Sequence, residues 1–385
     1  MKCAGRLAVA ASVLLAAAGP LIAAPLPPPG YDADMSGEEA GLWMQVDKAE
    51  ASLKVAPNIV RDPPLNAYVA QIVCRLAGDY CGTLRVYIVE TPEFNAAAMP
   101  NGAIMVNTGL LLRMQNEAQL AFVLGHEITH FLHRHTLAHM RMAVRTGGLV
   151  AVIGLATAAA GAGYLGSAVS TVGVGAIYSN SRDEERDADA NGFQVAVNSG
   201  YAPDEAPAIW RFMMAEDNAH EHKNRSAFLA DHPQSEERLA SLQKAADAAH
   251  DGRTGWIQNE DGYRAVVAPF LHRWVEDELA RGEPRESVIL FQRLTAAEPR
   301  NALYQYGLGE AYRRRNLAGD ALYAVAAYRA ALACSQPPAE AWRGIGLVTM
   351  KKGEKAEARE AFNAYRAQAP DATDKAMIDF YLTQL

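Results

Sequence analysis

The five residues His126-Glu127-Ile128-Thr129-His130 constrain this 385-residue chain more than any other segment. Histidines four residues apart share one face of an α-helix, so both rings can direct a nitrogen at one zinc ion. Glu127 lies beside that face, where it can reach a water on the metal. Asn116 and Gln119 have capping-box spacing at the head of the apolar run that contains the motif. The segment therefore predicts a zinc site on a long helix that carries residues 126–139, although such short motifs also occur by accident.

A third ligand must come from elsewhere, because a catalytic zinc ion takes three protein ligands and leaves a fourth position open to water. The third-histidine position of one known motif falls on Thr136, which excludes that arrangement. A carboxylate from a second helix is the other solution, and Glu185 is the best candidate, in the acidic segment 181–189. Asp189, one turn later, can accept the far N–H of a ligand histidine and fix its orientation. Taken alone, this segment also fits a solvated helix start whose acidic side chains complement the helix dipole.

Three more histidines follow the motif closely, at His133, His135 and His139. His133 lies three residues after His130, and the other two are themselves four residues apart. We expect all three at the surface or beside the site, because the sequence offers them no third ligand for a metal of their own.

The N-terminal residues have the pattern of an export signal. Residues 1–24 combine a short basic start with an apolar centre and a small-residue cleavage site, which predicts a secretory signal peptide. A proline-rich leader at 25–35 follows. Export favours a disulfide between Cys74 and Cys81, which would staple the end of a helix to the next strand; two unrelated core cysteines are the alternative.

Charge and hydropathy exclude some classes of protein. With 36 Lys and Arg against 44 Asp and Glu, the formal net charge of −8 gives no electrostatic case for a nucleic-acid partner. Residues 146–181 contain no charged side chain, and this run exceeds the roughly 20 residues that span a bilayer. Eight glycines interrupt it and no basic cluster fixes an orientation, so a lid or membrane-contacting segment and a buried helical hairpin are both favoured over a true span.

Periodicity divides the rest of the chain into elements. Helical spacing covers residues 36–56 and 65–77, whereas 84–89 and 103–107 have the pattern of strands that would form a small sheet. Residues 251–267 have the pattern of a connector of strand-like or irregular pieces.

The last part of the chain, residues 268–385, repeats with the period of about 34 residues that is typical of tetratricopeptide repeats. The clearest unit has the expected residues at Trp342, Ile345, Gly346, Gly353, Ala358, Phe362 and Pro370. The unit before it has them at Leu308, Gly309, Tyr312, Tyr328 and Pro337, with a loop insertion of three residues near Ala318. A weaker third unit has them at Gly282, Ser287, Phe291 and Pro299. An ordinary helical bundle is the alternative. Stacked repeats would leave a concave groove that binds a protein partner.

Four motifs together resemble the gluzincin family that contains the CAAX prenyl protease and the membrane heat-shock protease HtpX. They are Asn95-Ala-Ala-Ala-Met-Pro-Asn-Gly102, His126-Glu-Ile-Thr-His130, Ser181-Arg-x-x-Glu-x-x-Ala-Asp-x-x-Gly192, and His232-Pro233 followed by Arg238. With its signal peptide and repeats, the chain is most similar to the periplasmic BepA-type members, which act as protease and chaperone in outer-membrane protein assembly. The resemblance implies an α+β fold: a mainly helical gluzincin metallopeptidase domain with a small β-sheet at 36–250, followed by an all-α tetratricopeptide-repeat solenoid.

The resemblance also implies roles for single residues. His126, His130 and Glu185 would bind one zinc ion per chain, Glu127 would be the general base, and Asp189 would orient a ligand histidine. His232 matches a histidine that can occupy the fourth zinc position and hold the enzyme latent, and Arg238 matches an arginine near the reacting carbonyl. The sequence departs from the family at Asp187, where Glu is common, and at Asp231, where Thr or Ser is common.

These features predict a zinc-dependent endopeptidase of the periplasm that cleaves unfolded or misassembled envelope proteins. Glu127 would take a proton from metal-activated water, and Arg238 would stabilise the developing oxyanion. The strand Ala103-Ile104-Met105-Val106-Asn107 would offer an exposed edge to an extended substrate. The competing function is a periplasmic chaperone or assembly scaffold whose zinc site is latent or structural, with His232 as a fourth ligand. A membrane-spanning protease is a third hypothesis and depends on residues 146–181.

Overall fold

The computed structural model describes residues 26, 28–30, 40–145, 180–219, 232, 236–250 and 252–385. The predicted signal peptide, most of the proline-rich leader and the apolar residues 146–179 lie outside the described residues. Within them the chain is mostly helical and contains one three-stranded sheet, which confirms a mainly helical fold with a small sheet. No helix in this described part is both long and apolar enough to cross a membrane.

Two helices open the continuous part of the chain, α1 (Ala40–Val55) and α2 (Pro63–Ala77), where helical spacing predicts them. The side chain of Asp62 caps α2 by accepting a hydrogen bond from the backbone N–H of Leu65 at 2.9 Å. Pro63 occupies the first helical position, where its missing N–H has no cost.

A disulfide joins Cys74, in the last turn of α2, to Cys81 in the short 3-10 helix η1 (Gly78–Thr83). The Cα atoms of the two cysteines lie 4.5 Å apart. The end of α2 is thereby tied to the segment that leads into the sheet.

The sheet consists of β1 (Arg85–Val89), β2 (Ala96–Ala98) and β3 (Ala103–Asn107), in the order β1-β3-β2. β1 pairs with β3 in parallel, and β2 pairs with β3 antiparallel. The prediction that Ala103–Asn107 offers an exposed edge is therefore wrong, because β3 is paired on both sides. The sequence did not reveal β2, because this strand is only three alanines long. A turn at Gly102 (φ +85°) lets it pair with β3. Among the described strands, β2 forms the outer edge on that side.

The central helix of the domain is α4 (Glu117–Leu132), which α3 (Thr108–Arg113) precedes. The side chain of Asn116 accepts a hydrogen bond from the backbone N–H of Gln119 at 2.9 Å, which confirms the predicted cap. The expectation that one helix carries residues 126–139 is wrong, because α4 ends at Leu132. Arg134 adopts a left-handed conformation (φ +61°) that interrupts the helix, and α5 (His135–Arg145) follows.

Among the described residues, this part of the fold also contains α8 (Arg182–Asn198), α9 (Glu205–Asn218) and α11 (Glu236–Ala249). Ser181 and Glu184 form a capping box at the start of α8. α8 crosses α4 where Gly125 and Gly192 face each other, and a Cβ atom at Gly192 would lie 2.7 Å from the backbone nitrogen of His126. This close approach brings the N-terminal half of α8 against the two motif histidines.

We expect Gly192→Ala to lower the free energy of unfolding by about 1–3 kcal/mol, because the added methyl group meets backbone atoms of α4 that have no rotamer to change. It should also weaken metal binding, since α8 carries Glu185. Urea denaturation would measure the first effect. Gly41→Ala in α1 is the matched control: no neighbour lies within 4 Å of its Cβ position, and alanine has the better helix propensity. Equal losses in both variants would contradict the argument.

The C-terminal part of the chain is helical throughout. Its elements are α12 (Glu260–Val267), η3 (Ala268–Phe270), α13 (Leu271–Ala280), α14 (Pro284–Ala297), α15 (Ala302–Arg315), α16 (Asp320–Leu332), α17 (Glu340–Lys352), α18 (Lys355–Gln368) and α19 (Lys375–Gln384). The expected connector at 251–267 is only partly irregular, because α12 occupies half of it. Tyr263 of α12 is buried and donates a hydrogen bond to the carbonyl oxygen of Leu111, so α12 packs into the domain core.

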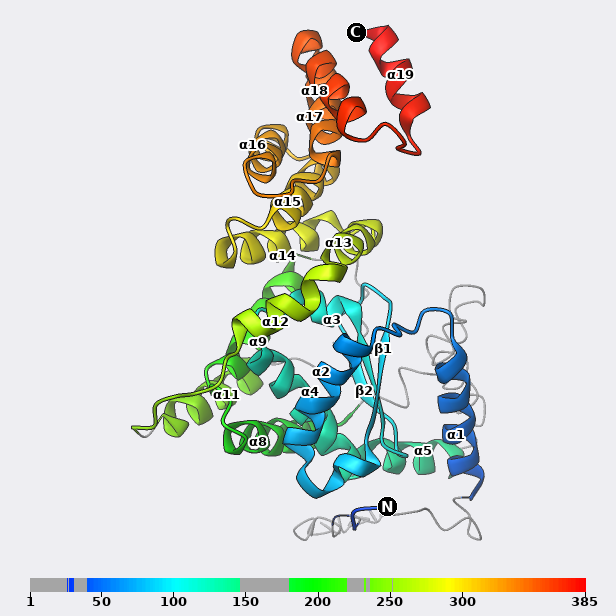
Figure 1. Cartoon of the computed structure of the whole chain (residues 1–385). Coiled ribbons are helices and arrows are strands. Elements are labelled where there is room, and N and C mark those ends of the chain that lie inside the picture. The colour runs from blue at the N-terminus through cyan, green and yellow to red at the C-terminus, as the bar shows by residue number, and fades with distance from the viewer. Residues whose placement is uncertain are drawn as a thin grey trace, which may run out of the picture.

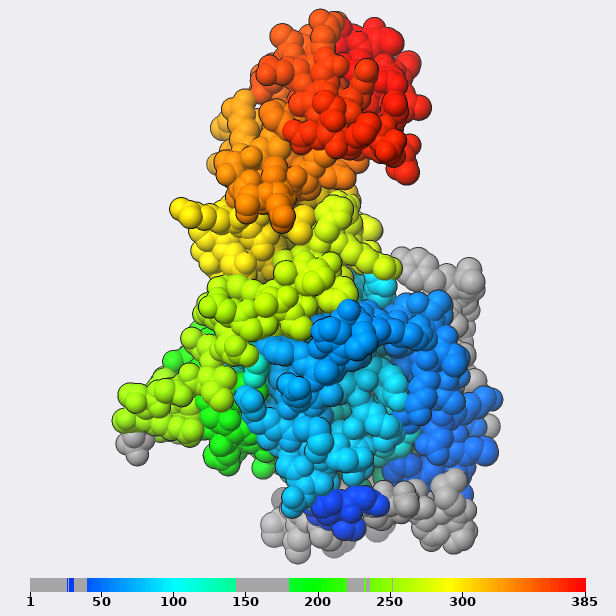
Figure 2. All heavy atoms as spheres, viewed as in Figure 1, coloured from blue at the N-terminus to red at the C-terminus, as the bar shows by residue number. Residues whose placement is uncertain are grey.

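The helices α13–α19 extend from one end of the larger N-terminal body (Figure 1). In the space-filling view they form an elongated lobe, coloured yellow-green to red (Figure 2). One cluster of buried apolar side chains nevertheless runs from Leu65 in α2 to Ala361 in α18. The lobe is therefore packed onto the body through a continuous core.

Candidate metal centre

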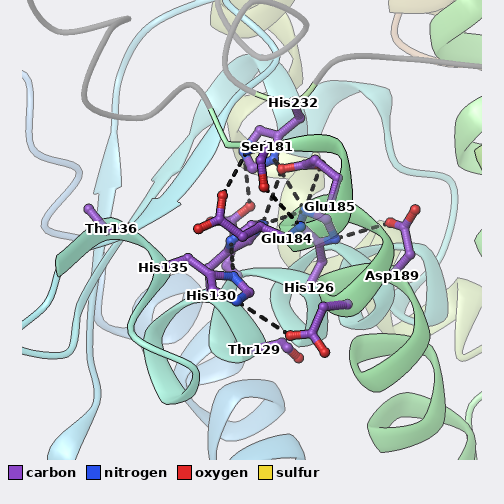
Figure 3. A network of polar contacts seen from close by, with 12 residues as sticks. His126, Thr129, His130, His135, Thr136, Ser181, Glu184, Glu185, Asp189 and His232 are labelled. Atoms are coloured by element: carbon purple, nitrogen blue, oxygen red, sulfur yellow. Dashed lines mark hydrogen bonds and ion pairs between the residues drawn. The ribbon is translucent and has the colours of Figure 1, made fainter. Parts of the chain in front are cut away.

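Four buried side chains converge in the body of the molecule: His126 and His130 from α4, Glu185 from α8, and His232 (Figure 3). Nε2 of His126 lies 3.0 Å from Nε2 of His130 and 3.2 Å from Nδ1 of His232. Oε1 of Glu185 lies 3.4 Å from Nε2 of His130 and 2.9 Å from Nδ1 of His232. Three imidazole rings and one carboxylate thus surround a common point.

Helix geometry places three of these four groups. The motif histidines lie one turn apart on α4, so their rings point to the same side. Glu185 lies two turns before Gly192 on α8 and faces them because the two backbones cross at that glycine. His232 comes from the chain between α9 and α11 and approaches from a third direction (Figure 3).

The charge states of His130 and Glu185 suit a cation. Burial lowers the pKa of His130 well below its ordinary value, so the ring stays neutral and keeps a lone pair for a metal. Burial acts to raise the pKa of Glu185, but His232 and His130 outweigh it and hold the pKa below its usual range. Neutral imidazole and ionised carboxylate are the forms in which these side chains bind divalent metals.

Asp189 and Arg238 contact the candidate ligands and each other. Oδ1 of Asp189 lies 3.2 Å from Nδ1 of His126, a contact that places the ring proton on Nδ1 and leaves Nε2 free. Arg238 donates from Nε and Nη2 to the two oxygens of Asp189 at 2.6 and 2.7 Å, and its Nη1 lies 2.6 Å from Oε2 of Glu185. Its guanidinium also lies over the ring of Trp210, 4.1 Å from the ring centroid. Arg238 therefore holds both carboxylates in place, and its role beside a reacting carbonyl stays a prediction.

Glu127 lies next to the four-residue cluster and is itself buried. Its Oε2 accepts a hydrogen bond from the backbone N–H of Ala98, in the edge strand β2, at 3.3 Å. Its Oε1 lies 3.6 Å from Nε2 of His232 and has no hydrogen-bond partner among the described residues. Burial raises the pKa of Glu127 above its ordinary value, and a carboxylate with a raised pKa takes up a proton more readily.

The residues present fit a zinc ion. Their ligand atoms all lie within 4.8 Å of one another, and two histidines with one carboxylate are a known catalytic zinc set. His232 would make the set four-coordinate and closed. The buried Oε1 of Glu127 is placed where an ion-bound water would satisfy it.

The sequence did not reveal two features of this region. The backbone N–H of Ala98 reaches Glu127 only because β2 exists, and a run of alanines carries no strand signal. A second group of donors, His133, His135 and Asp187, also lies within 4.8 Å. The unusual aspartate at position 187 was the available signal, but nothing in the chain order linked it to those histidines.

Comparison with known proteins relates the chain to metallopeptidases. Residues 62–246 match the model of peptidase family M48. The chain is 27% identical over 292 residues to the beta-barrel assembly-enhancing protease of Escherichia coli (strain K12), with 66% of this chain and 59% of that protein covered. It is 28% identical over 227 residues to the protein of the same name from Yersinia pestis, with 55% and 46% covered. It is also 28% identical over 166 residues to mitochondrial metalloendopeptidase OMA1 of Bos taurus, with 41% and 32% covered. The match thus spans less than two thirds of the length of each of these relatives.

Proposed function

Residues 62–246 form a metallopeptidase domain of family M48, and on this premise we propose that the chain is a zinc-dependent endopeptidase. The observation that carries the proposal is the convergence of His126, His130 and Glu185, with the carboxylate of Glu127 beside them. The proposed peptidase domain covers residues 36–250, and the proposed repeat domain covers 268–385.

The reaction would be hydrolysis of a peptide bond by an activated water molecule. A zinc ion held by His126, His130 and Glu185 would polarise the substrate carbonyl and lower the pKa of a bound water to about 7. Glu127 would accept the proton of that water on Oε1 and deliver it to the leaving amine. The hydrogen bond from Ala98 to Oε2 holds the carboxylate in the orientation that this transfer requires. The contact of Asp189 with Nδ1 of His126 would orient the ring so that Nε2 could bind the metal.

His232 would decide whether the site is latent or active. With its ring among the donors, the set has the four protein ligands that are typical of structural zinc. Its withdrawal would leave three ligands and one position for water.

The substrate would bind as an extended strand along β2. This strand is the outer edge of the described sheet on its side, and Ala98 in it contacts Glu127. Pairing through backbone hydrogen bonds reads sequence weakly and requires a free strand. Unfolded or misassembled polypeptides are therefore the proposed substrates.

Helix packing supports tetratricopeptide repeats in the C-terminal lobe. The ring of Tyr328 in α16 lies against Gly309 in α15, and the ring of Phe362 in α18 lies against Gly346 in α17. A Cβ atom added at either glycine would meet the facing ring, at 2.6 Å for Gly309 and 2.5 Å for Gly346, so only glycine fits. The two pairs are 19 and 16 residues apart, a difference of three that matches the insertion near Ala318. We propose that the groove of these repeats selects a protein partner.

The cellular role that we propose is quality control of envelope proteins in the periplasm. The relatives named beta-barrel assembly-enhancing protease support it, as does the predicted signal peptide. Peripheral contact with a membrane through residues 146–181 remains part of this proposal.

A second candidate function is a periplasmic chaperone or assembly scaffold with a structural zinc site. The observation that favours it is the presence of His232 in the cluster, at 3.2 Å from Nε2 of His126. In this alternative the zinc ion stabilises the fold and the repeats carry the activity.

Incubation of zinc-loaded residues 25–385 with casein tests the proposal. We expect fragments of casein on a gel, loss of cleavage after treatment with a chelator, and recovery when zinc is restored. His232→Ala should cleave faster than the parent if the histidine holds the site latent. If neither chain cuts casein while zinc stays bound, the peptidase proposal is wrong and the scaffold is favoured.

We expect Asp189→Asn to weaken zinc binding by about 10–100-fold. The neutral amide cannot hold the ring of His126 as the carboxylate does, and it also breaks the two-oxygen contact with Arg238. Competition with a fluorescent zinc chelator would measure the affinity. Asp183→Asn, a largely exposed position on the same helix, is the matched control and should bind zinc as the parent does. Equal affinity of both variants would remove Asp189 from the site.

A further inference from the structure

A second group of metal-ligand side chains lies beside the centre described above. His133 and His135 flank Arg134 in the turn between α4 and α5, and Asp187 lies on α8. Nδ1 of His133 is in hydrogen-bond contact with Oδ2 of Asp187, and Nε2 of His135 lies 3.4 Å from the same oxygen. The candidate ligand atoms of all three lie within 4.8 Å of one another.

Local structure brings these side chains together. The left-handed residue Arg134 ends one helix and lets the next begin at once, so the histidines on either side of it both reach α8. Asn191, one turn further along α8, donates a hydrogen bond to Oδ1 of Asp187 at 2.9 Å. That bond turns the carboxylate so that Oδ2 is the atom presented to the two rings.

The group is accessible, unlike the buried centre. The side chains of His133, His135 and Asp187 are 22%, 12% and 36% exposed. An ion from solvent can reach them without entering the buried centre. Two imidazoles and one carboxylate leave positions for water and suit zinc, cobalt(II) or nickel(II) rather than calcium or magnesium.

We infer that His133, His135 and Asp187 form a second site for a divalent transition metal, and that its occupancy weakens the catalytic site. Only the effect on the catalytic site rests on the proposed function. Metal binding at the second site is independent of any peptidase activity.

The coupling follows from the contact between Nδ1 of His135 and Nδ1 of His130, which lie 2.9 Å apart. With both rings neutral, this hydrogen bond contains one proton, which is carried by one of the two Nδ1 atoms. When Nε2 of His130 binds the catalytic ion, that proton belongs to Nδ1 of His130, and His135 must carry its own on Nε2. Binding of a second ion by Nε2 of His135 requires the opposite arrangement, which leaves His130 protonated on Nε2. The two ions therefore compete through one shared proton.

Equilibrium dialysis at increasing free zinc, followed by metal analysis, tests the site directly. We expect the full parent chain to bind about two ions and His133→Gln about one, because glutamine keeps a contact with Asp187 but supplies no imidazole. His250→Gln is the matched control: His250 also pairs with an aspartate, Asp204 at 2.8 Å, and this variant should bind as the parent does. If His133→Gln binds as much zinc as the parent, the second site does not exist.

Casein cleavage at the same zinc concentrations tests the coupling. Activity of the parent should rise with the first ion and fall at least about twofold as the second binds, whereas His133→Gln should keep its activity. Full activity of the parent with two ions bound would overturn the coupling. If the parent never cleaves casein but His133→Gln still binds one ion fewer, the second site stands and the proposed peptidase function fails.

Discussion

Replacement of Glu127 by glutamine is expected to abolish casein cleavage while the chain keeps its zinc. Glutamine preserves the shape of the side chain and can still accept the hydrogen bond from Ala98, but it cannot take up a proton. Loss of a positioned general base costs about 10²–10⁴-fold in rate. Because Glu127 is not one of the four donors that converge on the ion, zinc content should not change.

Glu184→Gln is the matched control for the Glu127→Gln cleavage experiment. Glu184 is the neighbour of Glu185 in the chain, and its Oε2 lies 2.9 Å from Nε2 of His139, outside the cluster of donors. This variant removes a carboxylate from the start of α8, the helix that carries Glu185, and should still cut casein. A Glu127→Gln chain that cleaves at the parent rate with zinc bound would show that another group accepts the proton.

Local sequence patterns were sufficient to predict the proposed ligands of this site. His126 and His130 follow from helix periodicity alone, and their helix start follows from the cap at Asn116. Glu185 was the best candidate for a carboxylate from a second helix, because it lies in the acidic segment 181–189. These features depend on residues that are near one another in the chain, which is where sequence patterns are strongest.

The contacts that the sequence could not supply are those between distant segments. The contact of Arg238 with Glu185 and Asp189 depends on how α11 packs against α8, and no spacing encodes that. The central place of β3 depends on β2, whose alanines have little strand preference. Asp187, the proposed third ligand beside His133 and His135, lies on α8, 54 positions after His133. It reaches the two histidines because α8 crosses α4 at Gly192.

A buried ionic cluster also connects the two parts of the molecule. Arg113 in α3 donates from Nε to Glu216 in α9 at 2.7 Å and from Nη2 to Glu278 in α13 at 2.9 Å. All three side chains are less than a tenth exposed. Burial acts to lower the pKa of Arg113, but the two carboxylates outweigh it and hold the pKa above its ordinary value. The guanidinium thus stays charged where the C-terminal helices pack onto the body.

Arg113→Met is expected to lower the free energy of unfolding by about 3–5 kcal/mol, because it leaves two buried carboxylates without their common partner. The loss should fall toward the lower end, since Glu278 keeps Arg281 at 3.0 Å and Glu216 keeps Arg293 at 3.8 Å. Urea denaturation followed by tryptophan fluorescence would measure it, with buried Trp274 on α13 as a probe of this contact.

Two further variants separate the loss of charge pairing from the loss of packing. Arg329→Met breaks a pair with Glu357 whose side chains are 64% and 39% exposed, so it should cost less than about 1 kcal/mol. Replacement of Arg113, Glu216 and Glu278 together by Met, Met and Leu should recover part of the stability that Arg113→Met loses, because the two carboxylates are then no longer buried without their partner. The recovery should not be complete, because Arg293 loses its pair with Glu216, whereas Arg281 keeps Glu286. If the triple variant is no more stable than the single one, the cluster contributes through its shape rather than its charges. A loss below about 1 kcal/mol in Arg113→Met itself would mean that the two carboxylates find solvent or new partners.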